Sequence, residues 1–262
     1  MADIVRTDLN DGVLEVTLNR PEKRNALSTA MFAALGEAFA QVEDPAVARV
    51  LVRAEGPVFC AGIDLDSLAA LAGAGNGAGS FESGGGELQR IFMALERAGK
   101  PSVCAVQGAA FGAGIQLALA CDLRVVAAGT RLGFFEIRYG IVPDLAGIHR
   151  AVQLIGPARA KDLVLTGREV DAEEALRLGL ADRVVPAAEV ESAARALLDE
   201  IGSRSAAATG AAKRLIDAAA AGQPPGENLA AVLREQLQLL QSLGFAQQAE
   251  RLATREVATP PA

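Results

Sequence analysis

Two short segments of the chain combine small residues with the start of a helix, a pattern that can bind a negatively charged oxygen. The first is FCAGID at residues 59–64, and the second is GAAFGAG at residues 108–114. The first N–H groups of a helix have no partner within the helix and lie at the positive end of its dipole. Because Gly and Ala leave the backbone accessible, two such turns facing each other would form an oxyanion hole. The alternative is that small residues only allow tight packing between a helix and a strand.

Two carboxylates lie in apolar stretches that could turn them into proton-transfer groups. Glu136 follows two phenylalanines in LGFFEIRYG at residues 132–140, and Asp144 lies in IVPDLAG at residues 141–147. An acid among apolar neighbours loses hydration, which raises its pKa from about 4 toward the range where a general base is most effective. The alternative for Glu136 is a surface ion pair with Arg138, and for Asp144 a turn or helix-capping role.

The histidine and cysteine content gives no sign of a metal site or a disulfide framework. The chain has one histidine, His149, and three cysteines, Cys60, Cys104 and Cys121, without a C-x-x-C pair. Metal-dependent mechanisms and zinc binding are therefore disfavoured. We expect the cysteines to be buried. A Ser-His-Asp hydrolase would need His149, but no serine nucleophile motif accompanies it, so we expect a packing or surface role.

The composition argues against several classes of partner. The 262 residues carry a formal net charge of -7, which disfavours a nucleic-acid or anionic-membrane surface. The first residues show no basic region followed by an apolar stretch, so no signal peptide is expected. Apolar runs are interrupted well before the roughly 20 residues that span a bilayer. Together with the absence of a disulfide pattern, this predicts a cytoplasmic protein.

The spacing of apolar residues predicts an α/β fold. Residues 4–18 are typical of a β-hairpin, and near-continuous apolar runs at 47–52, 102–106 and 122–126 indicate parallel strands covered by helices. Residues 72–86 are rich in Gly and are predicted to be a loop. From about residue 189 the pattern is helical. We therefore predict a core over residues 1–190 and a helical C-terminal region over residues 191–262.

Five segments in order along the chain resemble the crotonase (enoyl-CoA hydratase/isomerase) superfamily. They are NRPEKRNAL (19–27), FCAGIDL (59–65), KPSVCAVQGAAFGAGIQLALACDLRVVA (100–127), LGFFEIRYGIVPDLAGIHRAV (132–152) and LTGREVDAEEALRLGLADRVVP (165–186). Each segment alone is weak, but the ordered set covers nearly the whole chain and is highly specific.

The resemblance implies a fold, a substrate and an assembly. It implies a crotonase-like spiral core of repeated ββα units, with a helical C-terminal region that mediates a homotrimer or a hexamer built as a dimer of trimers. The implied substrate is an acyl-CoA thioester, with no metal or redox cofactor. The oxyanion-hole N–H groups would come from Ile63 and from Ala113, where the family pattern has a Gly. The implied CoA-binding residues are Lys23, Arg24, Ala26, Ala61, Asp64 and Leu65.

The catalytic positions depart from the family's pattern for hydration. Hydratases of the family use two glutamates to activate water, and the corresponding positions here are Gln116 and Glu136. An amide can hold a water or a carbonyl but cannot exchange a proton, which makes the usual two-acid hydration doubtful. Asp144 falls where dienoyl-CoA isomerases of the family carry an extra acid, although those enzymes also have an acid at the Gln116 position.

The leading hypothesis is isomerisation or hydration of an enoyl-CoA double bond, with isomerisation slightly favoured. Glu136 would be the principal acid/base, Asp144 a second acid or water-orienting group, and Gln116 a hydrogen-bonding partner of substrate or water. The alternatives are a conventional 2-enoyl-CoA hydratase and a non-catalytic acyl-CoA-binding protein, which the retention of both acids argues against. A purely structural trimer is disfavoured by the basic loop at residues 23–24 and by the two oxyanion turns.

Overall fold

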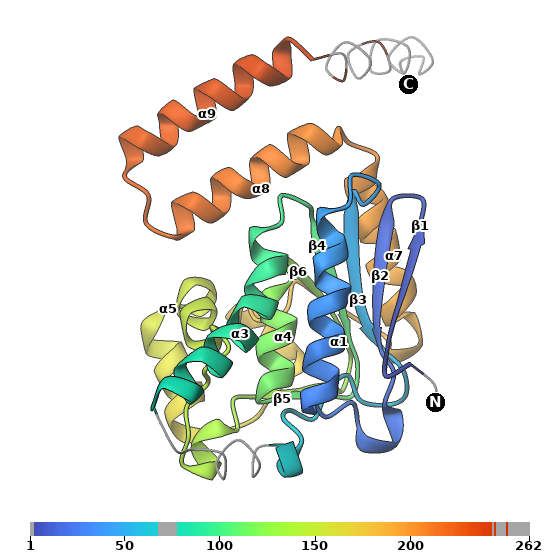
Figure 1. Ribbon diagram of the computed structural model, residues 1–262, viewed down its shortest axis with the longest axis vertical. Coiled ribbons are helices and arrows are strands. Elements are labelled where there is room, and N and C mark those ends of the chain that lie inside the picture. The colour runs from blue at the N-terminus through green and yellow to red at the C-terminus, as the bar shows by residue number, and fades with distance from the viewer. Residues whose placement is uncertain (1–2, 68–77, 243, 245–249, 251–262) are drawn as a thin grey trace.

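A six-stranded sheet with the order β1-β2-β3-β4-β6-β9 forms the centre of the computed structural model (Figure 1). The structure describes residues 3–67, 78–242, 244 and 250, and only the backbone over 78–85 and at 87. The first two strands form the predicted antiparallel hairpin, and every later neighbour in this sheet is parallel. The strands are β1 (Val5–Asn10), β2 (Val13–Leu18), β3 (Arg49–Ala54), β4 (Ser102–Val106), β6 (Leu123–Ala127) and β9 (Arg183–Val185).

A second, smaller sheet carries the residues that precede the site. It contains β5 (Ala109–Phe111), β7 (Arg131–Gly133) and β8 (Val170–Asp171), and Cys60 extends it through a bridge to Ala110. The segment over residues 108–114 therefore contains a short strand before its helix, because residues 109–111 pair with β7. Helix α4 (Ala113–Ala120) begins directly after this strand.

The two sheets and their helices form the repeated ββα units. In one unit, β4 in the large sheet leads to β5 in the small sheet and then to α4. In the next, β6 leads to β7 and then, through the 3-10 helix η3 (Glu136–Tyr139), to α5 (Gly147–Thr166). Helix α5 is interrupted at Gly156, whose backbone angles, φ 76° and ψ 163°, are not helical, so Pro157 begins its second part.

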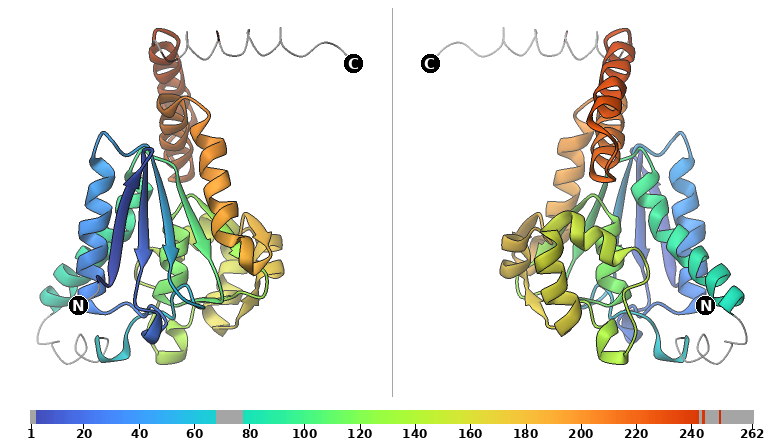
Figure 2. Two further views of the ribbon diagram at one scale, coloured as in Figure 1. Left: turned by 90° about the vertical axis from the view of Figure 1, so that its right-hand side faces the viewer. Right: turned by 90° about the vertical axis from the view of Figure 1, so that its left-hand side faces the viewer.

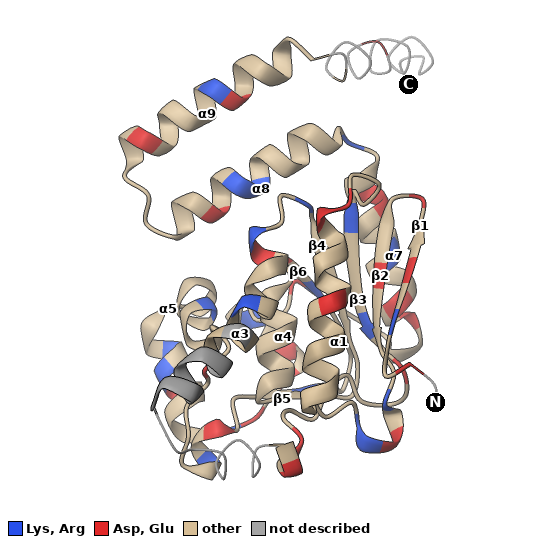
Figure 3. Cartoon of the chain, viewed as in Figure 1, with Lys and Arg blue, Asp and Glu red and all other residues tan. Residues whose placement is uncertain are grey.

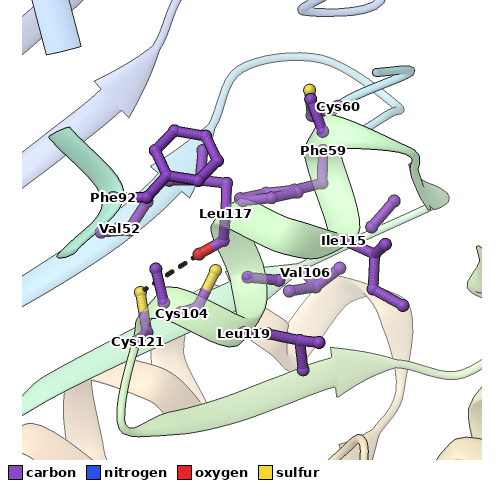
Figure 4. Close-up of a cluster of buried hydrophobic side chains, with 14 of the residues drawn as sticks. Val52, Phe59, Cys60, Phe92, Cys104, Val106, Ile115, Leu117, Leu119 and Cys121 are labelled. Atoms are coloured by element: carbon purple, nitrogen blue, oxygen red, sulfur yellow. Dashed lines mark hydrogen bonds between the residues drawn. The ribbon is translucent and has the colours of Figure 1, made fainter. Parts of the chain in front are cut away.

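Helices cover both faces of the large sheet (Figure 2). Helices α1 (Thr29–Ala40), α3 (Ala78–Arg97) and α4 lie on one face with the larger core cluster, and α7 (Val190–Gly202) lies on the other. Ser28 caps the start of α1, since its Oγ accepts a hydrogen bond from Met31 N at 3.3 Å. The expectation that the three cysteines are buried is also confirmed, and Figure 4 shows them in the core beside α4.

Local capping explains the short elements around these layers. Asp171 accepts a hydrogen bond from Glu174 N at the start of α6 (Ala172–Leu178), and Gly179 ends that helix with φ 97°. Three further 3-10 turns lie between these elements: η1 (Pro21–Lys23), η2 (Gln41–Glu43) and η4 (Ala187–Glu189).

The Gly-rich segment differs from its prediction. Residues 72–77 of the predicted loop lie outside the described residues, but residues 78–86 are helical and form the first turns of α3. Phe92 and Leu95, both fully buried, anchor the later turns of α3 in the core. A helix stabilised by such packing can extend through Gly, which costs only about 1 kcal/mol per residue relative to Ala.

The C-terminal part is helical, as predicted. Helices α8 (Ala206–Ala220) and α9 (Pro225–Leu240) form an antiparallel pair that stands away from the sheets (Figures 1 and 2). Large apolar side chains on this pair face solvent: Ile216, Leu229, Val232, Leu233, Leu237 and Leu240. Within the described residues, no helix combines the length and apolar composition needed to cross a membrane.

Candidate active site

The two helix-opening turns lie side by side. Phe111 N donates a hydrogen bond to Cys60 O at 3.0 Å, which joins the strand ends that lead into them. A Cβ added to Gly62 would lie 2.9 Å from Phe111 O and 3.9 Å from Ala113 N, so the two turns are in close contact. Gly62 has φ +108°, a conformation that residues with a side chain rarely adopt. The turn therefore needs Gly for both its backbone angle and its close approach.

The N–H groups of Ile63 and Ala113 have no acceptor among the described residues. Ala113 is the first residue of α4, so its N–H precedes the intrahelical ladder, which begins with Gln116 N donating to Gly112 O. The Ile63 peptide is held by Leu27, which donates to Gly62 O at 2.8 Å and accepts from Asp64 N at 2.9 Å. The geometry can thus present two unpaired donors to one ligand oxygen.

Glu136 is buried beside the second of these turns. Glu136 is only 7% exposed, and a Cβ added to Gly112 would lie 3.5 Å from Glu136 Oε1. Phe135 stacks on Phe111 with ring centroids 4.2 Å apart, which couples the Glu136 turn to the strand before Gly112. The alternative of a surface ion pair with Arg138 is wrong, because that guanidinium lies over the Phe135 ring and donates to Gly167 O at 2.8 Å.

The electrostatic surroundings of Glu136 favour its neutral form. Burial raises the pKa of the Glu136 carboxyl, and the charge of Asp144 raises it further. A hydrogen bond from Gln116 Nε2 to Glu136 Oε1 at 2.7 Å acts in the opposite direction, because it stabilises the carboxylate. The other oxygen, Oε2, is buried and has no hydrogen-bond partner among the described residues. Such a carboxyl can both accept and return a proton.

Gln116 is occupied by protein groups rather than open to the site. It is 1% exposed, and its Oε1 accepts hydrogen bonds from Leu145 N at 2.9 Å and Gly147 N at 3.0 Å. A Cβ added to Gly147 would lie 2.5 Å from Gln116 Oε1, so the close approach requires Gly. The predicted contact of Gln116 with substrate or water has little room in this arrangement.

Asp144 lies at a hollow of about 530 Å³ between α3 and the start of α5. It is solvent-exposed, but the surrounding protein removes part of its hydration and raises the pKa of its carboxyl. Gln89 Nε2 donates to Asp144 O at 2.6 Å. The lone His149 is exposed on the first turn of α5 and lines the same hollow. The hollow is lined by Gln89, Met93, Pro143, Asp144, Ala146, Ile148, His149 and Val152.

A buried asparagine fixes the basic loop before α1. Asn25 is fully buried; its Nδ2 donates to Glu55 O at 2.9 Å and Val58 O at 2.8 Å, and its Oδ1 accepts from Arg20 N at 2.8 Å. Lys23 and Arg24 are exposed on this loop, whose basic segment is visible at the lower edge of the molecule in Figure 3.

The same loop is bonded to the first helix-opening turn. Ala61 N donates to Arg24 O at 3.0 Å, and the Arg20 guanidinium donates to Ala26 O at 3.1 Å and Asp64 Oδ2 at 2.8 Å. The hydrogen bond from Arg20 lowers the pKa of the Asp64 carboxyl. Leu65 follows with 61% exposure. The structure therefore brings the residues predicted to bind CoA into one region beside Ile63.

Comparison with known proteins identifies the family. The family model described as enoyl-CoA hydratase/isomerase matches residues 8–251. The chain belongs to the enoyl-CoA hydratase/isomerase family. One relative, a protein of Mycobacterium bovis named probable enoyl-CoA hydratase echA8, is 35% identical over 217 residues, which cover 82% of this chain and 81% of the relative. The carnitinyl-CoA dehydratase of Salmonella enteritidis is 39% identical over 218 residues, which cover 82% of this chain and 80% of that relative.

Solved structures of the enoyl-CoA hydratase/isomerase family share the fold. A Thermobifida fusca relative in complex with CoA superimposes with a TM-score of 0.83 at 35% identity, covering 94% of this chain and 95% of that one. The structure of that relative in complex with acetoacetyl-CoA gives the same TM-score and identity, with 90% and 94% covered. The crotonase-like core and the helical C-terminal region are thereby confirmed.

Sequence reasoning did not identify several residues that organise this family member's site. Arg20 and Asn25 fix the basic loop, and both lie in the NRPEKRNAL segment. Asn25 is a polar residue next to the apolar pair Ala26-Leu27, and this position could have indicated its buried hydrogen-bonding role. Gly147 and the ring stack before Gly112 gave no such signal, because their partners are distant in the sequence. Among the described residues, no group of three or more His, Cys, Asp or Glu side chains could hold a metal ion.

Proposed function

We propose that this enzyme moves a proton on the carbons beside the carbonyl of an enoyl-CoA thioester, with double-bond isomerisation favoured over hydration. The observation that carries the proposal is the juxtaposition of two unpaired N–H groups, on Ile63 and Ala113, with a single buried carboxyl, Glu136. An amide, Gln116, lies where two-acid hydration would need a second proton-transfer group. The complexes of the Thermobifida relative with CoA and acetoacetyl-CoA support a thioester substrate.

The proposed reaction uses these groups in two proton transfers. The Glu136 carboxylate takes a proton from C2 of a 3-enoyl thioester, and the C–H electron pair moves into the conjugated system to give a dienolate. The Ile63 and Ala113 N–H groups stabilise the charge on the thioester oxygen, each by about 3 kcal/mol. Glu136 then returns the proton to C4, and the double bond forms between C2 and C3. The proton balance closes without a metal or redox cofactor.

The loop over residues 20–26 is the proposed CoA-binding element. Lys23 and Arg24 supply exposed cations for the phosphates of CoA, and the ion pair of Asp64 with Arg20 removes the repulsion that a free carboxylate would exert. Ala26, Ala61 and Leu65 supply the small and apolar surface next to these charges. Because Ala61 immediately precedes Gly62, ligand bound on this loop leads directly to the first oxyanion turn.

Hydration of a 2-enoyl-CoA is the second candidate function. It is favoured by the names of the relatives and by the electrostatic influence of Asp144 on Glu136. In this version Asp144 orients the water and takes the proton that it loses as its oxygen adds at C3, while Glu136 delivers a proton to C2. The two candidates differ in whether a second ionisable group is needed for turnover.

Replacement of Glu136 by Gln tests the proposal. Purified wild-type and Glu136→Gln enzymes would be assayed by ultraviolet absorbance against 3-enoyl-, 2-enoyl- and dienoyl-CoA substrates. We expect isomerisation to fall by about 10²- to 10⁴-fold, the usual contribution of a general acid/base. Glu173→Gln, at an exposed acid on α6, is the matched control and should retain full activity.

The outcomes separate the candidates. Undiminished isomerisation by Glu136→Gln would contradict the assigned role. Wild-type turnover confined to the 2-enoyl substrate, and lost in Asp144→Asn, would support hydration instead. Tight binding of an acyl-CoA in calorimetry, without turnover of any thioester on the panel, would support the non-catalytic alternative.

We further propose that the enzyme assembles as a homotrimer or as a hexamer made of two trimers. The α8–α9 pair exposes a row of leucines at helical spacing. A continuous apolar row that faces solvent is typical of a protein–protein contact. The pair projects beyond the core, where it can reach a neighbouring copy (Figure 2).

A further inference from the structure

The Gln116 side chain connects three elements of the site. It starts on α4, donates through Nε2 to Glu136 Oε1 on η3, and accepts through Oε1 from the turn that precedes α5. Two backbone N–H groups, of Leu145 and Gly147, point at one amide atom. Only the carbonyl oxygen can accept both, so the orientation of the amide is fixed and its NH₂ group must face Glu136.

This arrangement makes the two carboxylate oxygens of Glu136 unequal. Oε1 is held at 2.7 Å by an amide that is itself 1% exposed and confined by Gly147. Oε2 is buried and has no partner among the described residues. A buried oxygen without a hydrogen bond is costly when charged, and a proton on that oxygen removes the cost.

We propose that Gln116 is a positioning residue that anchors Glu136 Oε1 and leaves Oε2 as the oxygen that takes and returns the substrate proton. The inference rests on the acid/base role proposed for Glu136 and goes beyond it, since it assigns the transfer to one oxygen. It also replaces the idea that Gln116 contacts the substrate. Because the same amide holds Leu145, next to Asp144, it fixes the second carboxyl relative to the first.

The charged groups around Glu136 determine how its pKa responds to a change at Gln116. Asp144, on the turn before α5, raises the pKa of Glu136. Arg150 on α5 is already paired with Glu96 at 2.8 Å, and Arg138 on η3 is directed to Gly167 O. His149 on α5 is exposed. The backbone N–H of Glu136 and the hydrogen bond from Gln116 both hold the pKa of Glu136 down against burial and Asp144. The Gln116 bond is the one of these two contacts that a side-chain substitution can remove.

The test compares the pH dependence of kcat/KM for 3-enoyl-CoA isomerisation in two variants of nearly unchanged size. In Gln116→Met the hydrogen bond to Glu136 Oε1 is lost, so the acid limb of the profile should move up by about one pH unit. We expect kcat to fall about tenfold or more, with KM little changed. In Gln116→Glu the new carboxyl still accepts from the backbone N–H groups but faces Glu136 Oε1. Two carboxyls this close share one proton, so the limb should move further up.

Controls separate positioning from substrate contact and from damage to the fold. Gln41→Glu, at an exposed glutamine that ends α1, should leave the profile unchanged. Circular dichroism and the unfolding midpoint establish that each variant is folded; Gln116→Glu retains the backbone contacts and is the safer of the two. A lowered kcat with an unmoved acid limb in both variants would overturn the inference.

Two further results distinguish failure of this inference from failure of the proposed function. If Gln116→Glu gained hydration of 2-enoyl-CoA without a shift of the limb, position 116 would face the substrate and the inference would be wrong. If Glu136→Gln were fully active, the acid/base role itself would fail, whatever the Gln116 variants did. An inactive Glu136→Gln together with shifted limbs in both Gln116 variants is the result we expect.

Discussion

Glu136 is held in surroundings that disfavour its charged form, and this has a consequence for stability. Because the pKa of Glu136 is raised in the folded state, the folded protein binds the proton more tightly than the unfolded chain does. Stability therefore decreases as pH rises from the unfolded value, about 4.3, through the raised folded value. Above that window the full cost of the buried charge is present.

The Glu136→Gln variant should accordingly be more stable than the wild type at neutral pH. Gln can still accept the hydrogen bond from Gln116 but carries no charge, so we expect a gain of about 1–2 kcal/mol near pH 7.5. The gain should vanish near pH 4, where the wild-type carboxyl is protonated. Urea unfolding at the two pH values measures it, and an equal difference at both would contradict the electrostatic origin.

The chemistry of single residues could be predicted only where it depends on neighbours in the sequence. The apolar residues around Glu136 correctly indicated a buried acid, since Phe134 and Phe135 are adjacent to it. The bonds of Gln116 to Leu145 and Gly147 could not be predicted, because the turn that supplies them lies about 30 residues away. The roles assigned to Ile63, Ala113 and the CoA-binding residues stay predictions until they are tested.

At the scale of elements, the junction between α4 and the first oxyanion turn depends on a glycine. A Cβ added to Gly114 would lie 2.4 Å from Cys60 O, which is backbone and cannot move aside cheaply. Helix α4 packs against this turn, so any relief of the overlap displaces one from the other. The relative placement of Ile63 and Ala113 depends on this contact.

Gly114→Ala should therefore lower both stability and activity. We expect a loss of about 1–3 kcal/mol from overpacking, with a larger loss in kcat than in substrate affinity. Gly226→Ala is the matched control, since Gly226 is also helical, lies on α9 and has nothing within 4 Å of an added Cβ. Thermal unfolding and turnover would be measured for both; similar changes in the two variants would argue against the proposed overlap.

The longer elements could be predicted from sequence, and the shortest could not. The hairpin and the strand over 102–106 were predicted from the spacing of apolar residues. The small sheet was missed because β5 and β7 have three residues each and β8 has two, too few for an alternating pattern. Their pairing is set by the tertiary fold instead.

In a single copy of the protein, the apolar face of α8–α9 is not covered by any other part of the described chain. Leu229, Leu233 and Leu237 recur every four residues, and each is about 60% exposed or more. The division into a core over 1–190 and a C-terminal region over 191–262 stays a prediction, although α7, which begins at that boundary, packs on the central sheet. The C-terminal pair itself begins only at α8.

A charge placed on this face should weaken the proposed assembly. We expect the double variant Leu233→Glu/Leu237→Glu to sediment at a lower mass than the wild type in analytical ultracentrifugation. Gln238→Glu adds a charge to the same helix away from the leucines and should retain the wild-type mass. A wild-type protein that sediments as a monomer at all concentrations would contradict the assembly, and a variant with unchanged mass would place the contact elsewhere.

The reactivity of the buried thiols can report when and where the core opens. Cys60, Cys104 and Cys121 are free and inaccessible, and burial raises the pKa of Cys60 to about 12, so its reactive thiolate is scarce. An alkylating reagent can reach these sulfurs only when the core separates. Cys60 precedes Gly62 by two residues, and Cys121 lies at the far end of α4 (Figure 4). Their relative labelling rates would distinguish loosening near the thioester site from disruption of the whole interior.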